Sequence, residues 1–505
     1  IRRCRVFAPR SLSGPRNISP LPTRSWIASR ATTCVRRASC RASIACCSNE
    51  RSSVVSTFRV RRSASRNCAC CGSSRVTRSS ELMPKLIHVI GAGLAGLAAA
   101  VQLQRRGAQV VLHEAASEAG GRCRSYYDAQ LGATLDSGNH MVLSGNTATL
   151  NYVRAIGAAD ELVGPAQPDY PFVDLATQAR WIVRMSPGLL PWWIFDANAR
   201  VPNTGPSDYL MLLPLLFAKP ARTVAQTMRC NGPLWDRLLR PLFLAMLNVE
   251  PREASAELTG AMVRETLVAG GLACRPLIAR NGLSSAFVDP ALRLLQHGGA
   301  AIRLGSRLQN MVFADTGPAR VSALNFVDES IALDANQAVV LAVPPDVAQT
   351  LVPGLRSPAR FAANVSVHFA VEPPFGMAPV TGLLNATATW LFAFEGRVSV
   401  TVNAAERLLD IPHEALAKTV WAEVAQAANL PVEPMPAWQV VTEPRAMFAA
   451  LPDQETLRPG TRTRWNNVML AGDWTATGLP ATIEGAIRSG QKAADTLLNQ
   501  PMERR

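Results

Sequence analysis

Short apolar runs alternate with longer amphipathic stretches along the chain from residue 83 onward. The run LIHVI at 86–90 predicts a buried β-strand, and residues 97–106 carry the apolar spacing of a helix. A second apolar run at 110–112 predicts a second strand. Strands that alternate with helices are typical of a parallel sheet, so this part of the chain predicts a βαβ unit and an α/β fold.

Further strand-like runs occur far downstream. Residues 302–308 and 338–345 predict strands that are separated by a short meander. Residues 467–470 predict a buried strand, and a helix is expected from Ala481 towards Leu498. The strands of the chain are therefore spread over widely separated stretches.

A long apolar region lies between these two parts. Residues 181–247 are rich in Trp, Leu, Phe and Pro, and the prolines divide the region into short pieces. We expect a helical insertion that lines a channel for an apolar substrate or enters one leaflet of a membrane. The alternative is a buried dimer interface. The longest apolar run, 209–218, contains Pro214 and is too short to span a membrane, so the protein is not expected to be integral.

The charge is unevenly distributed over the 505 residues. The formal net charge is +15, but residues 1–82 hold 17 Arg, no Lys and only two acidic residues. The rest of the chain has 35 basic and 35 acidic residues and is neutral. Because the basic excess belongs to a segment without a periodic apolar face, no nucleic-acid partner is predicted.

Three interpretations apply to residues 1–82. Arg, Ser and few acids are typical of a transit peptide, although eight cysteines fit that poorly. Cys68 and Cys71 have the spacing of a zinc pair, but a second pair is missing. The favoured interpretation is an unstructured, non-native segment translated upstream of the true start, which is expected at Met83.

A glycine-rich loop joins the first predicted strand to the first helix. Its glycines are Gly91, Gly93 and Gly96, and Glu114 ends the second strand. Glycines at this spacing allow a tight turn and let the backbone approach a pyrophosphate at the helix N-terminus. An acid about 20 residues on accepts hydrogen bonds from ribose hydroxyls. All parts occur in register, so the segment predicts a dinucleotide site without choosing between NAD and FAD.

The next motif, Gly120-Gly121-Arg122, indicates which dinucleotide is bound. Here the sequence resembles the flavin-containing amine oxidase and phytoene desaturase superfamily, in which a Gly-Gly-Arg loop wraps the flavin pyrophosphate. The resemblance implies FAD as cofactor, with Gly121 and Arg122 in the site and Arg122 as its cationic fork. On local grounds alone, the motif is a surface turn with a solvated arginine.

By the same resemblance, the C-terminal part supplies the second half of the site. It implies that Gly472 and Asp473 meet the ribityl or pyrophosphate region. It also implies that the helix start at Thr482 and Ile483 lies towards the flavin ring, although Thr482 suits an ordinary helix cap as well. The backbone at Leu308 is expected to meet the adenine, the alternative being a plain strand.

His140 is the candidate catalytic residue. It closes the segment at 136–140, which in the superfamily passes beside the flavin ring. A histidine there can act as acid, base or hydrogen-bond donor, whereas a lone histidine elsewhere is more often packed or solvated. The other histidines show no metal-ligand spacing, so no metal site is predicted.

Lysine positions argue against amine oxidation. From residue 83 onward, only Lys85, Lys219, Lys418 and Lys492 occur, and none lies in a segment expected to face the flavin, where amine oxidases place a lysine. No second GxGxxG motif is present. Electrons are therefore expected to come from an external donor.

Three stretches resemble one branch of the superfamily, the hydroxysqualene dehydroxylases, also called squalene-associated FAD-dependent desaturases. They are residues 240–248, 442–449 and 471–485, and the resemblance extends over essentially 86–498. The chain departs from the family at Val249-Glu250 and at Pro444, neither of which belongs to a flavin motif.

This closer resemblance implies an activity. Reduced FAD would convert hydroxysqualene, a C30 polyprenoid allylic alcohol, to squalene with loss of water, and His140 would be the acid or would hold a water that serves as one. A carotenoid or phytoene-type desaturase is the alternative, followed by an amine oxidase and a non-enzymatic flavin-binding partner. The expected location is cytoplasmic, with peripheral contact at the inner face of the bacterial plasma membrane.

These expectations define a domain organisation. The predicted fold is α/β, with a Rossmann-like FAD-binding domain assembled from 83–150, 275–345 and 465–500. An α+β substrate domain with the helical apolar insertion is expected from 151–274 and 346–464.

Overall fold

The computed structural model describes residues 86–314 and 319–499, which all belong to one compact unit within Arg78–Arg505. Predictions made for residues 1–82 lie outside the described residues. The domain boundaries predicted from the sequence stay predictions, and the elements themselves are as follows.

A five-stranded sheet forms the first layer, and all of its strands are parallel. The strand order is β10-β2-β1-β14-β20. Its members are β1 (Leu86–Ile90), β2 (Gln109–His113), β10 (Ala301–Arg303), β14 (Gln337–Leu341) and β20 (Val468–Leu470). Three separated stretches of chain therefore build one parallel sheet, and this is the predicted α/β fold class.

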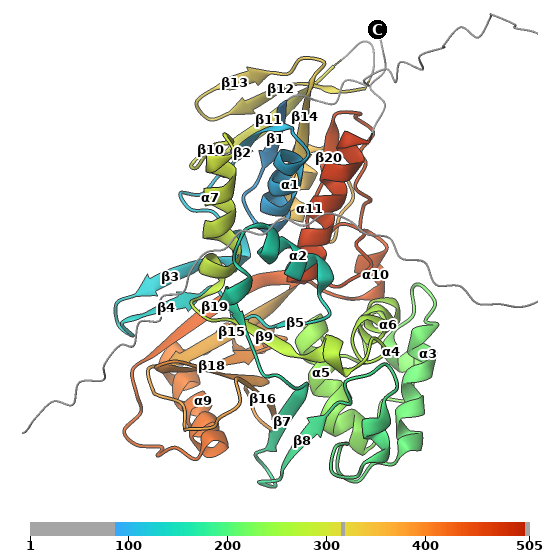
Figure 1. Ribbon diagram of the computed structural model, residues 1–505, viewed down its shortest axis with the longest axis vertical. Helices are drawn as coiled ribbons and strands as arrows, with labels where there is room; N and C mark the ends of the chain where they lie inside the picture. The colour runs from blue at the N-terminus through green and yellow to red at the C-terminus, as the bar shows by residue number, and fades with distance from the viewer. Residues whose placement is uncertain (1–85, 315–318, 500–505) are drawn as a thin grey trace, which may run out of the picture. The chain divides into compact units, whose positions relative to one another are not determined.

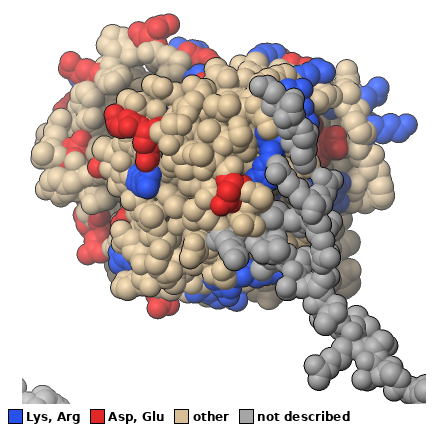
Figure 2. Space-filling view, turned by 90° about the horizontal axis from the view of Figure 1, so that it is seen from above, with Lys and Arg blue, Asp and Glu red and all other residues tan. Residues whose placement is uncertain are grey.

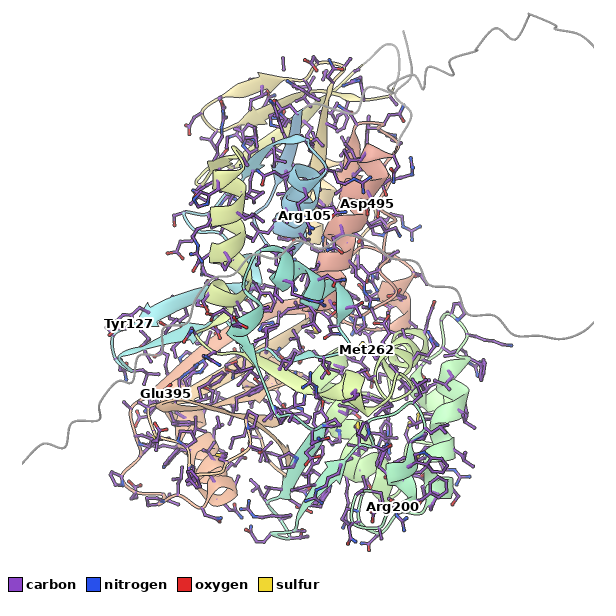
Figure 3. The ribbon with its side chains drawn as sticks, viewed as in Figure 1. Arg105, Tyr127, Arg200, Met262, Glu395 and Asp495 are labelled. Carbon is purple, nitrogen blue, oxygen red and sulfur yellow. The ribbon has the colours of Figure 1, made fainter. Side chains whose placement is uncertain are left out.

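Helices α1 (Leu94–Arg105) and α11 (Ile483–Leu498) lie side by side against this sheet (Figures 1 and 3). Their backbones are close, since a Cβ at Gly490 would lie 2.0 Å from the carbonyl oxygen of Ala95. The Gln102 side chain of α1 also donates to the Asp495 carboxylate of α11 at 3.0 Å. The first and last helices of the described chain are thus packed together through a small-residue contact.

The predicted strand at 302–308 is wrong in one respect, because the structure divides it. Gly305 has a φ of +71°, a left-handed turn that ends β10. The chain then starts a three-stranded antiparallel sheet, which is the expected meander. Its strands are β11 (Leu308–Phe313), β12 (Val321–Phe326) and β13 (Ser330–Ala332).

A seven-stranded sheet forms the second layer. Its order is β19-β15-β18-β17-β16-β7-β8. The strands are β7 (Asp169–Asp174), β8 (Arg180–Arg184), β15 (Phe361–Phe369), β16 (Val380–Leu384), β17 (Trp390–Phe394), β18 (Arg397–Val402) and β19 (Trp438–Phe448). One face packs on helix α9 (His413–Ala428) through valines such as Val367, Val400 and Val424.

The apolar insertion consists of short helices, as the prolines predict. They are η3 (Trp192–Phe195), η4 (Pro206–Leu212), α3 (Leu213–Leu216), α4 (Val224–Thr227), η5 (Trp235–Leu239) and α5 (Arg240–Leu247), and α6 (Ala256–Glu265) follows the insertion. Trp181, which we expected at the start of the helical insertion, instead lies in β8 and stacks on Phe172 of β7, with ring centroids 5.7 Å apart. Cross-strand packing outweighs the surrounding helical pattern at this position.

The remaining elements connect these layers. They are η1 (Gly121–Cys123), β3 (Ser125–Asp128), β4 (Ala133–Asp136), β5 (Val142–Leu143), α2 (Thr147–Ala155), η2 (Ala159–Glu161), β6 (Leu162–Val163), η6 (Gly271–Cys274), β9 (Pro276–Ala279), η7 (Ser284–Val288), α7 (Asp289–His297), α8 (Pro345–Leu351), η8 (Ala405–Leu408) and α10 (Pro452–Glu455). Among the described residues, no helix has both the length and the hydropathy that crossing a membrane requires.

Three histidines in the five-stranded and seven-stranded sheets are buried, and they should make the free energy of unfolding depend on pH. Burial lowers the pKa of His88 to about 4, that of His113 to about 3 and that of His368 to about 3. The unfolded chain takes up protons near pH 6.5 while the folded chain does not, so stability falls as pH decreases.

We therefore expect the free energy of unfolding to decrease from pH 6.5 to pH 4, by at most about 1.4 kcal/mol per pH unit for each histidine. Denaturant unfolding at several pH values measures this slope. Carboxylates also titrate in this range, so the slope of wild type alone does not identify the histidines. The variant His88→Val isolates one of them, because its free energy of unfolding should depend less steeply on pH by the contribution of one proton. An unchanged slope in that variant would contradict the assignment.

Candidate active site

The glycine-rich loop between β1 and α1 contains two glycines that the backbone itself requires. A Cβ at Gly91, which has a φ of +100°, would lie 2.5 Å from the carbonyl oxygen of Ala342. A Cβ at Gly96 would lie only 1.8 Å from the carbonyl oxygen of Gly91. Both distances are far below van der Waals contact, so these glycines permit the close packing of loop, helix and β14.

Gly93 lies in the opposite kind of surroundings. A Cβ there would meet no atom within 4 Å, and its φ of −71° is open to any residue. Gly93 is the N-cap of the 12-residue helix α1 and offers no side chain to the first-turn N–H groups. An open space in front of unpaired N–H groups and the positive end of a helix dipole fits a pyrophosphate.

Glu114 follows β2 and holds the same loop. One carboxylate oxygen accepts from the Ala92 N–H at 2.7 Å and the other from the Ala116 N–H at 2.9 Å. This bracing contact was not predicted from the sequence. A carboxylate has about four acceptor positions, so the predicted contact with ribose hydroxyls is compatible with it.

Gly121 and Arg122 lie beside this loop. A Cβ at Gly121 would stand 3.5 Å from the Cα of Gly93, so the Gly-Gly turn covers the helix start. Arg122 Nη2 is 2.7 Å from a carboxylate oxygen of Asp473, and its Nη1 donates to the carbonyl of Ala446. The Arg122 side chain is about half exposed and yet ion-paired, so it joins the two predicted halves of the site across 351 positions of sequence.

The loop that carries Asp473 is tightly folded. Gly472 has a φ of +143°, and a Cβ there would lie 2.3 Å from the indole nitrogen of Trp474. That indole donates to the carbonyl of Val343 at 2.9 Å. The N–H of Gly472 donates to Ser489 Oγ of α11 at 2.8 Å. These contacts attach the Asp473 loop to β14 and α11, so the position of its carboxylate is set by the sheet.

Arg458 is a residue of this region that sequence reasoning missed. It is buried, and its guanidinium donates to the backbone carbonyls of Asp473, Thr475 and Leu479. Its Nη1 also lies 2.7 Å from the carboxylate of Glu455. One buried cation thus fixes the whole loop. The sequence offers no signal for it, because Arg458 lies outside every motif.

Thr482 and Ile483 begin α11. The Thr482 hydroxyl accepts from the Gly485 N–H at 3.0 Å, so it is a helix cap, while Ile483 is buried. The neighbouring Glu484, also missed, accepts from the N–H groups of Ala148 and Thr149 at 3.0 and 2.8 Å and so caps α2. The side-chain roles at this helix start are therefore structural, and a contact with a flavin remains a prediction that concerns the helix N-terminus.

Leu308 is the first residue of β11 and is buried. Two positions earlier, Ser306 donates its N–H to the carbonyl of Glu114 at 2.8 Å. The chain therefore passes next to the end of β2 immediately before Leu308. The backbone contact with an adenine, as implied by the family resemblance, stays a prediction.

His140 follows β4 and is partly buried. Its Nδ1 lies 2.7 Å from the carbonyl oxygen of Gly138, which can only accept, so Nδ1 carries a proton. Burial lowers the pKa of His140, with Arg122 contributing in the same direction. The neutral ring therefore presents Nε2 as an acceptor, an arrangement that suits the holding of a water better than direct proton donation.

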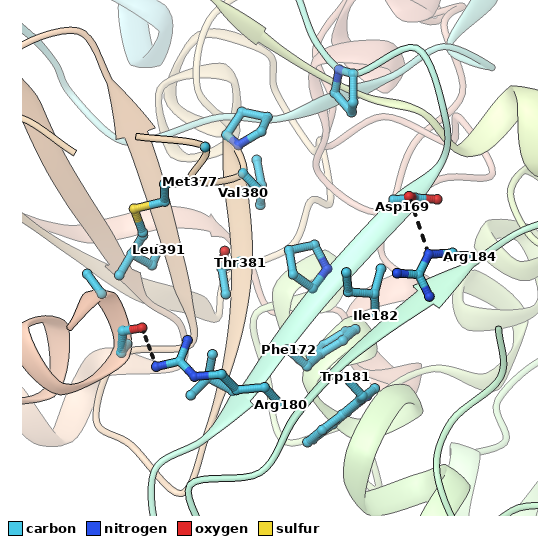
Figure 4. Close-up of a pocket in the computed structure, with 18 of the residues that line it drawn as sticks. Asp169, Phe172, Arg180, Trp181, Ile182, Arg184, Met377, Val380, Thr381 and Leu391 are labelled. Carbon is cyan, nitrogen blue, oxygen red and sulfur yellow. Dashed lines mark hydrogen bonds and ion pairs between the residues drawn. The ribbon is translucent and has the colours of Figure 1, made fainter. Parts of the chain in front are cut away.

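A separate cavity of about 860 Å³ lies at the β8 edge of the seven-stranded sheet (Figure 4). Three arginines line it, but Arg180 donates to the carbonyl of Ala427 at 2.8 Å, Arg184 pairs with Asp169 at 3.8 Å and Arg200 donates to the carbonyl of Ile194 at 3.1 Å. None of the predicted cofactor residues lines this cavity. It offers apolar walls and already paired charges, so it is a poor candidate for the chemistry.

Both acidic and basic side chains are visible on the face in Figure 2, the acidic ones mostly to the left and the basic ones mostly to the right. This matches the neutral composition of the chain after residue 82.

No group of three or more His, Cys, Asp or Glu side chains within 86–314 and 319–499 has the arrangement of a metal site.

Comparisons with known proteins agree with this arrangement. The family model of flavin containing amine oxidoreductases matches residues 94–498. The hydroxysqualene dehydroxylase of Rhodopseudomonas palustris is 52% identical over 417 residues, which cover 82% of this chain and 99% of the relative. That of Sinorhizobium fredii is 50% identical over 418 residues, which cover 83% and 99%.

More distant proteins share the fold. The 15-cis-phytoene desaturase of Glycine max is 23% identical over 476 residues, which cover 83% of this chain and 80% of that protein. A solved structure of a putrescine oxidase double mutant has a TM-score of 0.61 at 16% identity, over 82% of this chain and 99% of the other. The chain belongs to the flavin containing amine oxidoreductase family and, within it, to the hydroxysqualene dehydroxylases.

Proposed function

We propose that this protein is an FAD-dependent oxidoreductase that reduces hydroxysqualene to squalene with loss of water. The observation that carries the proposal is the Arg122–Asp473 ion pair, which joins two flavin motifs in a chain of the hydroxysqualene dehydroxylase family. The alternative, a phytoene-type desaturase, would use the same cofactor on a related polyene, but the relatives of that kind are far more distant.

The proposed cofactor contacts follow from the geometry of the loops. The open helix start at Gly93 receives the pyrophosphate, and the Gly121 turn covers it. Arg122 supplies positive charge, while Asp473 holds Arg122 in place and offers a second oxygen to cofactor hydroxyls. Glu114 keeps the loop in the conformation that binds FAD. Its carboxylate also accepts hydrogen bonds from the ribose hydroxyls.

When bound and reduced, the flavin supplies the hydride. The protein must do the rest, which is to exclude water and deliver one proton to the leaving oxygen. The allylic C–O bond breaks, the oxygen leaves as water after protonation, and a C–H bond forms at the carbon. An external electron donor then restores the reduced state. His140 acts by holding, at Nε2, a water that donates one hydrogen to Nε2 and passes its other hydrogen to the leaving oxygen, and a proton from solvent then restores that water.

Anaerobic incubation tests this function. The purified protein with FAD bound is reduced photochemically and mixed in detergent with hydroxysqualene or with phytoene. We expect stoichiometric squalene from hydroxysqualene together with reoxidation of the flavin, and no reaction of phytoene with either redox state. Conversion of phytoene by the oxidised protein, without conversion of hydroxysqualene, would establish the desaturase instead.

The role of His140 has its own test. We expect His140→Ala to bind FAD and hydroxysqualene normally but to form squalene at least about 100-fold more slowly, because general acid catalysis contributes on that scale. His297→Ala is the matched control, since His297 is exposed and lies on α7. An undiminished rate in His140→Ala would remove this residue from the mechanism.

We also propose that the insertion contacts a membrane, where the apolar substrate dissolves. Its exposed side chains include Trp192, Phe195, Leu210 and Phe217, with exposed fractions from 60 to 83%. Several exposed apolar side chains of this size within one short segment are unusual on a surface that faces only water. The contact is apolar, so it should depend little on the charge of the lipid headgroups.

Vesicle co-sedimentation tests this contact. Trp192→Asp with Phe217→Asp should reduce binding to phosphatidylcholine vesicles by at least about tenfold, because burial of each side chain contributes roughly 1.5–3 kcal/mol. Phe375→Asp is the matched control, since Phe375 is fully exposed but lies at the rim of the 860 Å³ cavity. Equal loss in both variants would place the contact elsewhere.

A further inference from the structure

The face of the seven-stranded sheet that points away from α9 carries a buried polar cluster. Val367 of β15 and Val400 of β18 pack towards α9, so the alternating residues project from the other face. His368 and Ser399 are direct cross-strand partners on that face, and both are fully buried. Buried polar groups are costly unless they are paired, so each polar atom of the cluster should have a hydrogen-bond partner.

The neighbours of His368 fix its tautomer. Its Nδ1 lies 2.9 Å from Nη1 of Arg397 and 2.8 Å from Oγ of Ser399. A guanidinium can only donate, so Nδ1 is the acceptor and the neutral ring carries its proton on Nε2. The low pKa of His368, caused by burial and by Arg397, keeps the ring neutral. The structure thus presents Nε2–H as a fixed donor.

This donor has no partner among the described residues, and the Nε2 atom is buried. A buried donor without a hydrogen bond costs about 1–3 kcal/mol, so a ring held in this orientation requires a compensating contact for that donor. A water or a ligand oxygen can provide that contact. The hydrogen bonds that Arg397 and Ser399 make to Nδ1 hold the ring in this orientation.

An unpaired acceptor lies on the same face. The Asn139 amide donates through Nδ2 to the carbonyl of Val400 at 3.1 Å and to Oγ1 of Thr401 at 3.3 Å. Because a carbonyl only accepts, the amide cannot be flipped, and its Oδ1 is buried without a partner. Asn139 precedes the candidate catalytic residue His140, so the cluster adjoins the candidate active site.

The residues that carry the two unpaired groups both contact β18. His368 is paired with Ser399, and Asn139 contacts Thr401, two residues further along β18. Side chains two residues apart on a strand project from the same face about 7 Å from each other. A shared oxygen atom requires its donor and its acceptor to lie within about 6 Å of each other, a separation that an imidazole and an amide side chain reach by extending towards each other from such positions.

We propose that His368 Nε2–H and Asn139 Oδ1 form a binding site for the hydroxyl group of the allylic alcohol. This inference rests on the proposed function and names the residues that recognise the substrate. A hydroxyl accepts from Nε2–H and donates its own hydrogen to Oδ1, so it satisfies both groups at once. Squalene has no hydroxyl and leaves both groups unpaired. The site therefore favours substrate over product.

Binding to the oxidised protein, where no turnover occurs, tests the site. The holoenzyme is titrated with hydroxysqualene and with squalene in detergent, and the change in flavin absorbance reports binding. Wild type should bind hydroxysqualene at least about tenfold more tightly than it binds squalene. His368→Leu and Asn139→Leu should lose this preference through weaker hydroxysqualene binding alone, while His368→Gln, which keeps an amide donor, should retain part of it.

His413→Leu is the control, because His413 is exposed at the start of α9 and should change neither affinity. Equal weakening of both ligands in the His368 and Asn139 variants would mean that these residues are structural. Unchanged affinities would mean that the cluster holds only water. Either result overturns the proposal.

Wild-type turnover separates this test from that of the function. If wild type converts hydroxysqualene while the variants keep the preference, the hydroxyl site is wrong and the function stands. If wild type binds hydroxysqualene in preference to squalene, loses that preference in the variants and yet forms no squalene, the hydroxyl site stands and the function is wrong.

Discussion

Gly96→Ala is expected to abolish FAD binding by preventing the native loop from forming. The added Cβ would lie 1.8 Å from the carbonyl oxygen of Gly91 and 3.3 Å from Cβ of Ala342. Since the first of these is a backbone atom, no side-chain rearrangement relieves the overlap. We expect a loss of more than about 3 kcal/mol in the free energy of unfolding, together with protein that is purified without flavin.

Gly93→Ala is the matched variant, because a Cβ there meets no protein atom within 4 Å. Its free energy of unfolding without flavin should stay within about 1 kcal/mol of wild type. Its affinity for FAD should fall at least about tenfold, since the methyl group occupies the space assigned to the pyrophosphate. Denaturant unfolding of the apoprotein and equilibrium dialysis with FAD measure the two effects. Normal FAD affinity in Gly93→Ala would place the pyrophosphate elsewhere.

Arg458→Met is expected to have the second large effect. The substitution removes the donor shared by the carbonyls of Asp473, Thr475 and Leu479 and leaves the carboxylate of Glu455 without its cation. Breaking a buried ion pair in this way costs about 3–5 kcal/mol. Because the same loop holds Asp473 against Arg122, FAD affinity should fall along with stability.

Two further variants make the Arg458 prediction specific. Arg458→Lys keeps the charge but offers three donors in place of the planar fork, so it should recover only part of the stability. Arg464→Met is the control, since Arg464 is exposed and lies six residues further along the chain. Differential scanning calorimetry and flavin content of the purified proteins measure both effects. If Arg458→Met keeps wild-type flavin content, Arg458 does not position the loop.

Some predictions from the sequence succeed because the interactions are local. Strand, loop, helix and second strand from Leu86 to His113 follow one another without interruption, and backbone geometry alone explains the glycines at 91 and 96. The helix from Ile483 to Leu498 was likewise expected from its apolar spacing. In these segments, the conformation of each residue is determined mainly by its neighbours in sequence.

Other predictions fail or stay incomplete because they depend on partners far away in sequence. The strand expected at 302–308 is broken at Gly305, where the chain leaves one sheet for another. Trp181 was expected in the helical region and is a strand residue, because it stacks on Phe172. The sequence shows neither the change of sheet nor the stacking partner.

The sequence by itself determined the cofactor loop, the neutral charge of the chain after residue 82 and the resemblance to flavin enzymes that act on polyprenoids. Only the tertiary structure decided which charges are paired, since Arg122 meets Asp473 across 351 positions of the chain. It also assigned the structural role of Arg458 and the donor atom of His368. The physical reason is that a backbone motif is encoded by adjacent residues, whereas hydrogen bonding of a buried side chain depends on which distant segments the fold brings against it.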